Sequence, residues 1–241
     1  MTKKIIISLP SKGRIRSGSL KIFKKKGLNI KFDKGDRDLI GQVMFNKSKI
    51  VCIFQHARES INALANSTAD IAISGIDLLQ NSDLEVQKKI KIYKRLNYAH
   101  ATLGIFCLNS WIDCQTMLDV SEIASEMLKK NKEPMKCSTK YRRLVENFFV
   151  EKNVKNLTRE WFASKGITQY EIINSKGATE GTIAAEISDM CTELTSSGET
   201  LRQNNLKIIG TILESSACLF YSKKSLKKKG VKKILKLLSK N

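Results

Sequence analysis

Short apolar runs alternate with amphipathic segments along the whole chain. Runs rich in Ile, Val and Leu, such as residues 4–9 and 50–54, predict buried strands. Segments such as residues 58–66 and 120–130 place apolar side chains three and four positions apart, which is typical of helices that pack on one face. Strands that alternate with helices in this way predict an α/β fold with a mainly parallel sheet.

The same patterns assign the other elements of the chain. Further strands are expected at residues 70–73, 90–96, 102–108, 135–139, 170–174, 188–194, 207–213 and 217–221. A helix is expected at residues 17–26, ended by Gly27, and a basic amphipathic helix at residues 225–240. Residues 141–154 and 154–167 are near-copies, and the second copy needs its own surface to bury Trp161 and Phe162.

Composition narrows the class of protein. The chain has 241 residues and is 41% hydrophobic, which suits one large domain or two lobes with a real core. We find no signal-peptide pattern and no apolar run of the ~20 residues that a membrane helix needs, so we expect a soluble, cytoplasmic protein. The six cysteines show no C-x-x-C spacing, which argues against structural zinc and favours buried free thiols in a reducing compartment.

The net charge of +20 indicates that the chain binds anions. Nucleic acid and small polyanionic substrates are the two classes of partner that fit. The lysines are spread along the chain, without the interleaved aromatic residues or the modules of nucleic-acid-binding proteins. We therefore favour small anions and expect no nucleic-acid partner.

Residues 193–201 combine a strand end, a hydroxyl-rich turn with one glycine, and a helix start. Backbone N–H groups in such a turn lack internal partners, and Gly198 lets a phosphate approach the backbone. Thr195, Ser196, Ser197 and Thr200 add hydroxyl donors, while Glu193 could lie near a metal or a sugar hydroxyl. The segment therefore predicts an anion site, although an ordinary strand–turn–helix joint has the same spacing.

This segment resembles the phosphoribosyl-pyrophosphate loop of phosphoribosyltransferases. Three other stretches are similar to one family among them, the ATP phosphoribosyltransferases of histidine biosynthesis. They are residues 9–14 (LPSKGR), 70–77 (DIAISGID) and 177–181 (GATEG). Their order along the chain also matches, and with residues 138–141 (STKY) the resemblance extends from Ile5 to Tyr221.

The resemblance implies a two-lobed fold of the type II periplasmic-binding-protein kind, with the substrates in a cleft between the lobes. Lobe I would contain residues 1–98 and 208–241, and lobe II would contain residues 99–207 with the loop. A non-catalytic binding protein for small anions or solutes with the same fold is the alternative; it would not need Glu180, Asp189 or a hydroxyl-rich phosphate turn.

The resemblance also implies the reaction, in which 5-phosphoribose passes from phosphoribosyl pyrophosphate to N1 of ATP, with Mg²⁺ as the natural cofactor. Lys12, Arg14, Glu180 and Asp189 would be catalytic. The residues implied for phosphoribosyl pyrophosphate are Glu193, Thr195, Ser196, Ser197, Gly198, Glu199 and Thr200. Those implied for ATP are Ser11, Gly13, Ser74, Gly75 and Asp77, and no metal ligand is assigned.

Two residues depart from the family pattern. Glu193 replaces the more usual Asp, and Glu186 stands where a small residue, often Gly, is expected. The 20 residues after Tyr221 cannot form the C-terminal regulatory domain of long family members. The chain therefore resembles the short form, which implies a homo-oligomer and a regulatory subunit similar to histidyl-tRNA synthetase.

Overall fold

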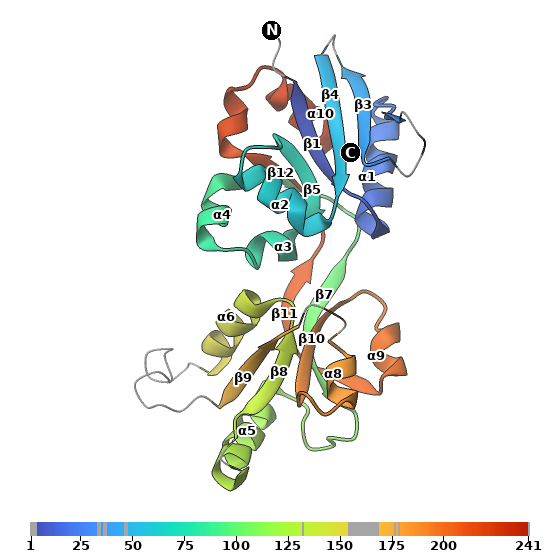
Figure 1. Ribbon diagram of the computed structural model, residues 1–241. Helices are drawn as coiled ribbons and strands as arrows, with labels where there is room; N and C mark the ends of the chain where they lie inside the picture. Colours follow the sequence, from blue (N-terminus) through green and yellow to red (C-terminus); the bar gives the residue numbers. More distant parts are fainter. Residues whose placement is uncertain are drawn as a thin grey trace. The chain divides into compact units, whose positions relative to one another are not determined.

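The chain forms two compact α/β units, which Figure 1 shows in the colours of the sequence. The computed structural model describes residues 4–32, 35, 38–45, 48–131, 133–153, 169–175, 177 and 179–240. Unit 1 consists of residues 1–100 and 215–241, and unit 2 of residues 101–214. The chain therefore leaves unit 1 once and returns to it once.

Unit 1 is built on a seven-stranded sheet. Its strand order is β2 (Lys31–Phe32), β3 (Ile40–Phe45), β4 (Ser48–Gln55), β1 (Ile5–Pro10), β5 (Ile71–Gly75), β12 (Ala217–Ser222) and β6 (Ile90–Arg95). The central strand β1 runs parallel to both neighbours, with Ile7 opposite Cys52 on β4 and opposite Ile71 on β5. The carboxyl ends of β4, β1 and β5 therefore meet at one edge of the sheet.

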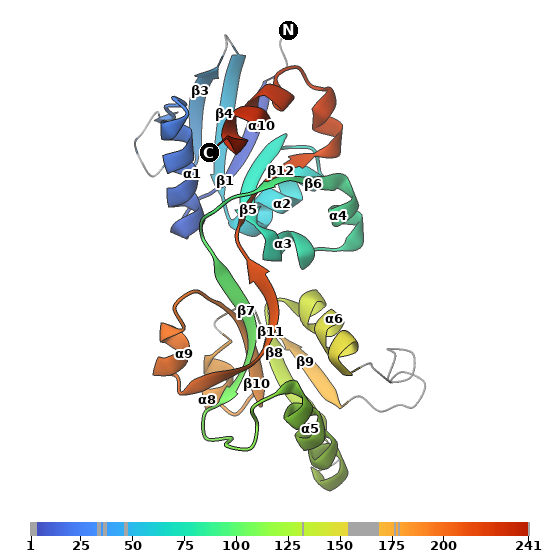
Figure 2. The same ribbon diagram turned by 180° about the vertical axis from the view of Figure 1, so that it is seen from behind.

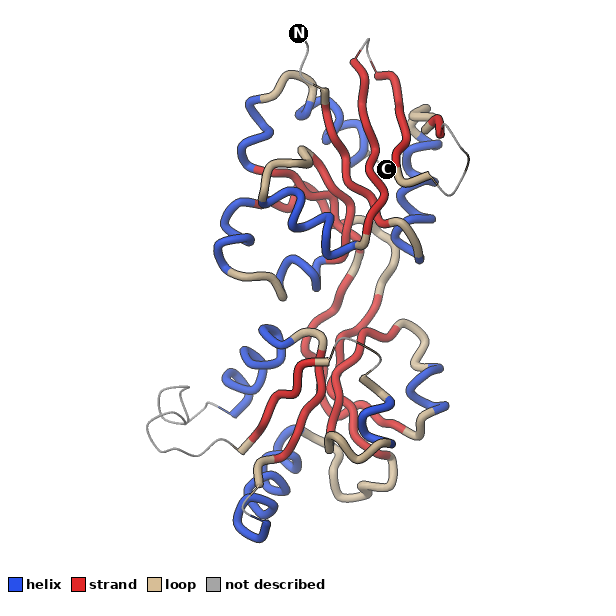
Figure 3. The backbone as a smooth tube through the Cα atoms, viewed as in Figure 1, coloured by secondary structure: helices blue, strands red, loops and turns tan. Residues whose placement is uncertain are grey.

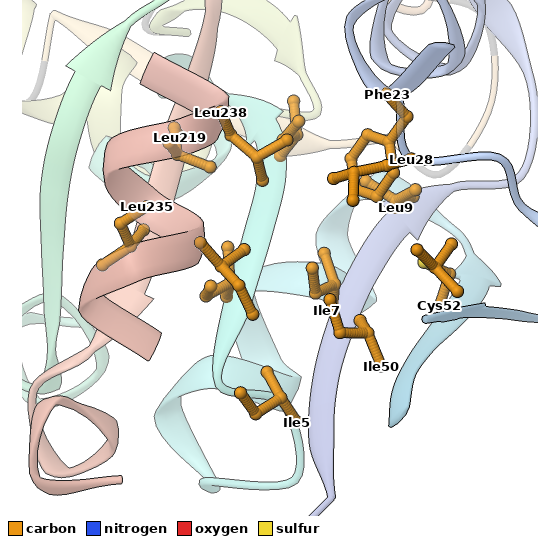
Figure 4. Close-up of a cluster of buried hydrophobic side chains, with 14 of the residues drawn as sticks. Ile5, Ile7, Leu9, Phe23, Leu28, Ile50, Cys52, Leu219, Leu235 and Leu238 are labelled. Carbon is orange, nitrogen blue, oxygen red and sulfur yellow. The ribbon is translucent and has the colours of Figure 1, made fainter. Parts of the chain in front are cut away.

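Helices cover both faces of this sheet (Figures 1 and 2). On one face lie α1 (Gly13–Lys25) and α10 (Val231–Ser239), which follows the 3₁₀ turn η1 (Lys223–Lys227). Their apolar stripes bury Phe23, Leu235 and Leu238 against Ile7 and Leu219 of the sheet, as Figure 4 shows. On the other face, α2 (Ala57–Ala65), α3 (Ile76–Gln80) and α4 (Leu84–Lys89) enclose a second apolar cluster around Ile61, Leu64 and Phe220.

Unit 2 contains a five-stranded sheet. The order is β11 (Leu206–Ser215), β7 (Ala101–Leu108), β10 (Met190–Thr195), β8 (Met135–Thr139) and β9 (Tyr170–Asn174). Strands β8, β9 and β10 are parallel, and β7 is antiparallel to β10. The helices are α5 (Met117–Asn131), α6 (Arg142–Asn153), α8 (Gly181–Ala184) and α9 (Glu199–Gln203), and Figure 3 shows them around the strands.

Several sequence-based expectations need correction. The sheets are mixed and not mainly parallel, because the β2–β3 hairpin and the returning strand β12 add antiparallel pairs. The expected helix 17–26 begins at Gly13, and the expected helix 225–240 is divided at Gly230, whose φ is 95°. Strands β2 and β3 were not predicted at all.

The unit boundary after β11 also differs from the sequence analysis. There the crossings fell at residues 98/99 and 207/208, whereas β11 belongs to the unit 2 sheet through Glu214 because it pairs with β7. Residues 142–153 of the first near-copy, 141–154, form α6, while the second, 154–167, lies outside the described residues. Among the described helices, none is both long and apolar enough to cross a bilayer.

Candidate functional site

A pocket in unit 2 gathers most of the predicted loop residues. It has a volume of about 370 Å³ and lies at the carboxyl ends of β8 and β10. The side chains and backbone that line it are Lys140, Glu180, Glu193, Leu194, Thr195, Ser196, Ser197, Glu199, Thr200 and Leu201. Hydroxyl groups, carboxylates and one ammonium therefore meet in one concavity, which suits a polar, phosphorylated ligand.

The loop that follows β10 is ordered by its own side chains. The Thr195 hydroxyl accepts a hydrogen bond from the Gly198 N–H at 2.9 Å, and Gly198 has a φ of 71° as the N-cap of α9. This conformation favours glycine. Within the described part of the chain, no protein acceptor pairs with the backbone N–H groups of Ser196 and Ser197. Both groups are therefore available to an anion in the pocket.

Two of the glutamates that line this pocket differ in their hydrogen-bond partners. The Glu193 carboxylate is 18% exposed and is held by Lys140, with Nζ 2.8 Å from Oε2 and 2.9 Å from Oε1. The Thr179 hydroxyl lies 2.9 Å from Glu193 Oε2. In contrast, Oε2 of Glu180 is buried and has no hydrogen-bond partner among the described residues. An unpaired buried carboxylate oxygen is costly, so its position in a pocket indicates a ligand donor or a cation as the missing partner.

Glu199 lies on the rim of the pocket. Its carboxylate accepts hydrogen bonds from Arg202 at 2.7 Å and Gln203 at 3.2 Å, both on its own short helix α9. The Arg202 guanidinium and its hydrogen bond lower the pKa of this exposed carboxyl group below its ordinary value. Glu199 therefore stays charged while it pairs within α9.

Asp189 lies at the opposite end of β10 from the loop. Its carboxylate accepts a hydrogen bond from the Lys136 N–H at 2.7 Å, and its own N–H donates to the Lys136 carbonyl at 2.9 Å. Asp70 in unit 1 makes the same reciprocal pair with Ile6, at 2.8 Å in both directions. This repeated motif aligns a parallel strand with its neighbour and gives Asp189 a structural role, while its catalytic role stays a prediction.

In unit 1 a second group of predicted residues lies at the carboxyl end of β1. Lys12 is the N-cap of α1, and Gly13 and Arg14 form its first turn, so the predicted turn is a helix N-terminus. Ser11 precedes them and donates its N–H to the Gln55 carbonyl at 2.8 Å. Lys12, Gly13 and Arg14 are exposed, and Arg14 donates to the His100 carbonyl at 3.2 Å. Unpaired N–H groups and two cations at one helix start suit phosphate oxygens.

The carboxyl end of β5 lies next to that of β1, but its residues are not accessible to a ligand. Ser74, Gly75 and Asp77 are all buried there. The Ser74 hydroxyl donates to the Ala57 carbonyl at 2.9 Å, and Asp77 accepts from the Ser215 hydroxyl at 2.6 Å. A Cβ atom on Gly75 would lie 2.3 Å from the Asp77 carboxylate. These residues therefore shape the edge, whereas Ser11, Lys12, Gly13 and Arg14 are accessible.

Sequence reasoning missed Lys140 and Thr179 as site residues. Both lie in stretches that carried the resemblance, 138–141 and 177–181, but only the folded sheet places them beside Glu193. The signal was positional, because a lysine directly after a parallel strand lies at the ligand edge of the sheet. Among the described residues, no three His, Cys, Asp or Glu side chains come close enough together to form a metal site.

An α/β unit with a hydroxyl-rich loop, acidic side chains and free backbone N–H groups at a strand end defines a class of protein that binds phosphorylated sugars or nucleotides. The family model described as HisG, ATP phosphoribosyltransferase, matches residues 57–240. The chain is 34% identical over 222 residues to the ATP phosphoribosyltransferase of Rhizobium etli, covering 91% of this chain and 90% of the relative. It is 30% identical over 227 residues to that of Nitrobacter winogradskyi, covering 93% of this chain and 66% of the longer relative.

Solved structures share the fold. The ATP phosphoribosyl transferase (HisG:HisZ) complex from Thermotoga maritima contains a chain that superposes with a TM-score of 0.69 at 19% identity, over 97% of this chain and 96% of that one. An arginine-bound mutant of ArgBP from Thermotoga maritima superposes with a TM-score of 0.50 at 10% identity, over 98% of this chain and 94% of that one. The architecture is thus also similar to that of periplasmic binding proteins. The chain belongs to the ATP phosphoribosyltransferase family, whose pentosyl transfer is the first step of histidine biosynthesis.

Proposed function

We propose that the unit 2 pocket binds phosphoribosyl pyrophosphate and that the carboxyl end of β1 in unit 1 binds the phosphates of ATP. One observation carries the first assignment: Glu180 Oε2 is buried without a partner in a pocket that also presents hydroxyls and free N–H groups. A ribose hydroxyl donates the hydrogen bond that Glu180 lacks, and the turn of residues 195–198 receives the 5-phosphate.

The transfer requires orientation and charge neutralisation more than a strong base. The N1 lone pair of adenine attacks C1 of the ribose, the C1–O bond to pyrophosphate breaks with inversion, and pyrophosphate leaves with the bonding electrons. Lys12 and Arg14 supply positive charge toward anionic phosphate oxygens, and Gly13 permits close approach of the backbone. Thr195, Ser196, Ser197 and Thr200 hold the transferred group in place.

The residues present fit Mg²⁺ that arrives with the substrate. Glu180 and Glu193 line one pocket, and hard oxygen ligands of this kind, together with phosphate oxygens, suit Mg²⁺. No cage of three protein ligands exists in the described part of the chain, which agrees with an ion held mainly by phosphates and water. When bound, the ion would neutralise charge on the leaving pyrophosphate.

We further propose that the chain works in the cytoplasm as a short-form enzyme, in a homo-oligomer with a regulatory subunit. One solved structure of similar fold is a complex named HisG:HisZ, which supports a second kind of subunit. Light scattering on the purified chain tests the homo-oligomer, because a strictly monomeric species at micromolar concentration contradicts it. Titration with histidine tests the regulatory subunit, because strong inhibition of the single chain without any partner contradicts a separate subunit for this role.

Gly198→Val tests the loop assignment. Valine at a φ of 71° strains the backbone, and its β-branched side chain narrows the phosphate turn. We expect the KM for phosphoribosyl pyrophosphate to rise about tenfold or more, because one charge-assisted hydrogen bond to the phosphate is lost. The KM for ATP should change little. Absorbance near the adenine band follows product formation with Mg²⁺ present.

Gly27→Val is the matched control, because Gly27 has a nearly equal φ of 69°, lies in unit 1 away from the loop, and a Cβ atom there meets nothing within 4 Å. Equal effects of Gly198→Val on both substrates would show that the loop is structural only. Binding of either compound without any progressive change in absorbance would instead favour the non-catalytic solute-binding alternative.

A further inference from the structure

Lys140 occupies a distinctive place in the unit 2 pocket. It directly follows β8, and its ammonium reaches the neighbouring strand end to contact both oxygens of Glu193, at 2.9 Å and 2.8 Å. The two side chains are 30% and 18% exposed, so the pair is only partly screened by water. Among the described side chains that line the pocket, Lys140 is the one cation, beside Glu180, Glu193 and Glu199.

The pair has a geometric consequence for the phosphate turn. Glu193 lies two residues before Thr195 and lines the same pocket as Ser196 and Ser197, whose N–H groups are open. A carboxylate released near these groups would compete for them with an incoming phosphate, since both are anions that accept hydrogen bonds from N–H donors. Lys140 holds the carboxylate at the strand end together with the Leu194 N–H, 3.1 Å from Oε1, and with the Thr179 hydroxyl, which Glu193 shares with the Thr192 carbonyl.

We infer that Lys140 is a positioning residue, which fixes the Glu193 carboxylate toward the sugar hydroxyls and away from the phosphate turn. This inference rests on the proposed assignment of the pocket to phosphoribosyl pyrophosphate. Lys140 acts through Glu193 and does not itself bind the 5-phosphate. Its effect therefore falls on one substrate and disappears when Glu193 carries no charge.

The test is a double-mutant cycle on the full-length protein. The variants are Lys140→Met, Lys140→Arg, Glu193→Gln and the double variant Lys140→Met/Glu193→Gln. Each is measured by steady-state kinetics with either substrate varied, and by calorimetric titration with phosphoribosyl pyrophosphate and Mg²⁺. Lys136→Met is the matched control, because Lys136 lies at the other end of β8 and pairs with the exposed Glu133.

We expect Lys140→Met to weaken binding of phosphoribosyl pyrophosphate and to raise its KM about tenfold, the value of one charge-assisted contact, with kcat and the KM for ATP changed much less. Lys140→Arg restores most of the loss because it keeps the cation. In the Glu193→Gln variant, the further change Lys140→Met should raise the KM for phosphoribosyl pyrophosphate less than about twofold, because the carboxylate that Lys140 holds is already absent.

Two outcomes overturn the inference separately from the proposed function. If Lys140→Met has its full effect on the Glu193→Gln background, Lys140 contacts the substrate directly. If Glu193→Gln weakens binding but Lys140→Met does not, the pocket assignment stands and the positioning role is wrong. If Glu193→Gln, Lys140→Met and Glu180→Ala all leave phosphoribosyl pyrophosphate binding unchanged, the pocket assignment itself fails. If Lys140→Met does not fold, the comparison of Lys140→Arg with Glu193→Gln still decides, because a loss in Lys140→Arg equal to that in Glu193→Gln contradicts a role based on charge.

Discussion

The backbone conformation at Glu186 explains why a small residue, often glycine, is expected at this position. It follows α8 with a φ of 54°, in the left-handed region that most L-residues avoid. Its N–H donates to the Ile183 carbonyl, and the next N–H, of Ile187, donates to the Thr182 carbonyl, which is the Schellman ending of a helix. Glu186 is exposed and does not line the unit 2 pocket, so its charge lies outside that site.

We expect Glu186→Gly to stabilise unit 2. Left-handed geometry costs an ordinary residue about 1–2 kcal/mol, and glycine returns about 0.5–1 kcal/mol of this as extra unfolded-state entropy. The free energy of unfolding should therefore rise by about 0.5 kcal/mol in urea titrations, while the steady-state kinetics of the transferase reaction stay unchanged. Glu186→Val is the opposite control, because β-branching makes the same φ worse; equal stability of the two variants would contradict the argument.

Three charged residues of the predicted catalytic set now separate into two groups. Glu180 lines the unit 2 pocket and Lys12 is exposed at the start of α1, whereas Asp189 pairs with the backbone of Lys136. Lys12→Ala and Glu180→Ala should each lower kcat/KM about tenfold or more, because a charge-assisted contact contributes ~1.5–3 kcal/mol. Asp189→Ala should instead lower the melting temperature while kcat/KM, measured where the protein is folded, stays within about twofold. A selective kinetic loss in Asp189→Ala would instead support a catalytic role for this residue.

At the scale of elements, sequence patterns found the central strands and missed the edges. Residues 50–54 and 102–108 are largely apolar because both faces of these strands are covered, and runs this short favour strands over helices. Strand β3 buries Gly41 and Val43 but exposes the apolar Ile40 and Met44 on its other face, so its sequence lacks the alternation of apolar and polar residues that predicts a strand. Strand direction depends on long-range pairing, so the antiparallel strand β12 could not be read from its own residues.

The candidate site shows the same division. Residues 193–200 were found because turn chemistry is local, with Thr195 and Gly198 in direct contact. Lys140 was missed because its partner Glu193 lies on another strand. The helical start at Gly13 was missed because the N-cap, Lys12, makes no side-chain capping bond that a pattern could reveal.

A nearly buried ion pair helps to anchor the C-terminal segment of unit 1. Lys228 Nζ lies 2.6 Å from Asp70 Oδ2, and the Ser225 hydroxyl donates to Asp70 Oδ1 at 2.8 Å. The Asp70 side chain is 9% exposed, so Lys228→Met leaves a nearly buried carboxylate without its cation. We expect a loss of about 2–3 kcal/mol in unfolding free energy, somewhat below the range for a fully buried pair. The exposed neighbour Lys227 is the control, and Lys227→Met should stay within about 0.5 kcal/mol of wild type.

At the scale of the whole molecule, the six cysteines provide internal reporters for each unit. Cys52 and Cys218 lie in unit 1, while Cys107, Cys114, Cys137 and Cys191 lie in unit 2, and all six are buried free thiols. Burial raises the pKa of Cys52 and of Cys191 to about 12. A thiol becomes nucleophilic only as the thiolate, so none should react in the native protein near neutral pH, and each should react when its unit opens.

These reporters can test where each substrate binds. A ligand stabilises the form that binds it by RT ln(1 + [L]/Kd), which is about 2.7 kcal/mol at a hundredfold excess over Kd. In urea below the main transition, phosphoribosyl pyrophosphate with Mg²⁺ should slow alkylation of Cys137 and Cys191 more than that of Cys52 and Cys218. ATP should do the reverse, because its proposed contacts, Lys12 to Arg14, belong to unit 1. Peptide mapping by mass spectrometry measures all six sites in one sample. Equal protection of both groups by either ligand would mean that the units open together, and reversed protection would exchange the two substrate sites.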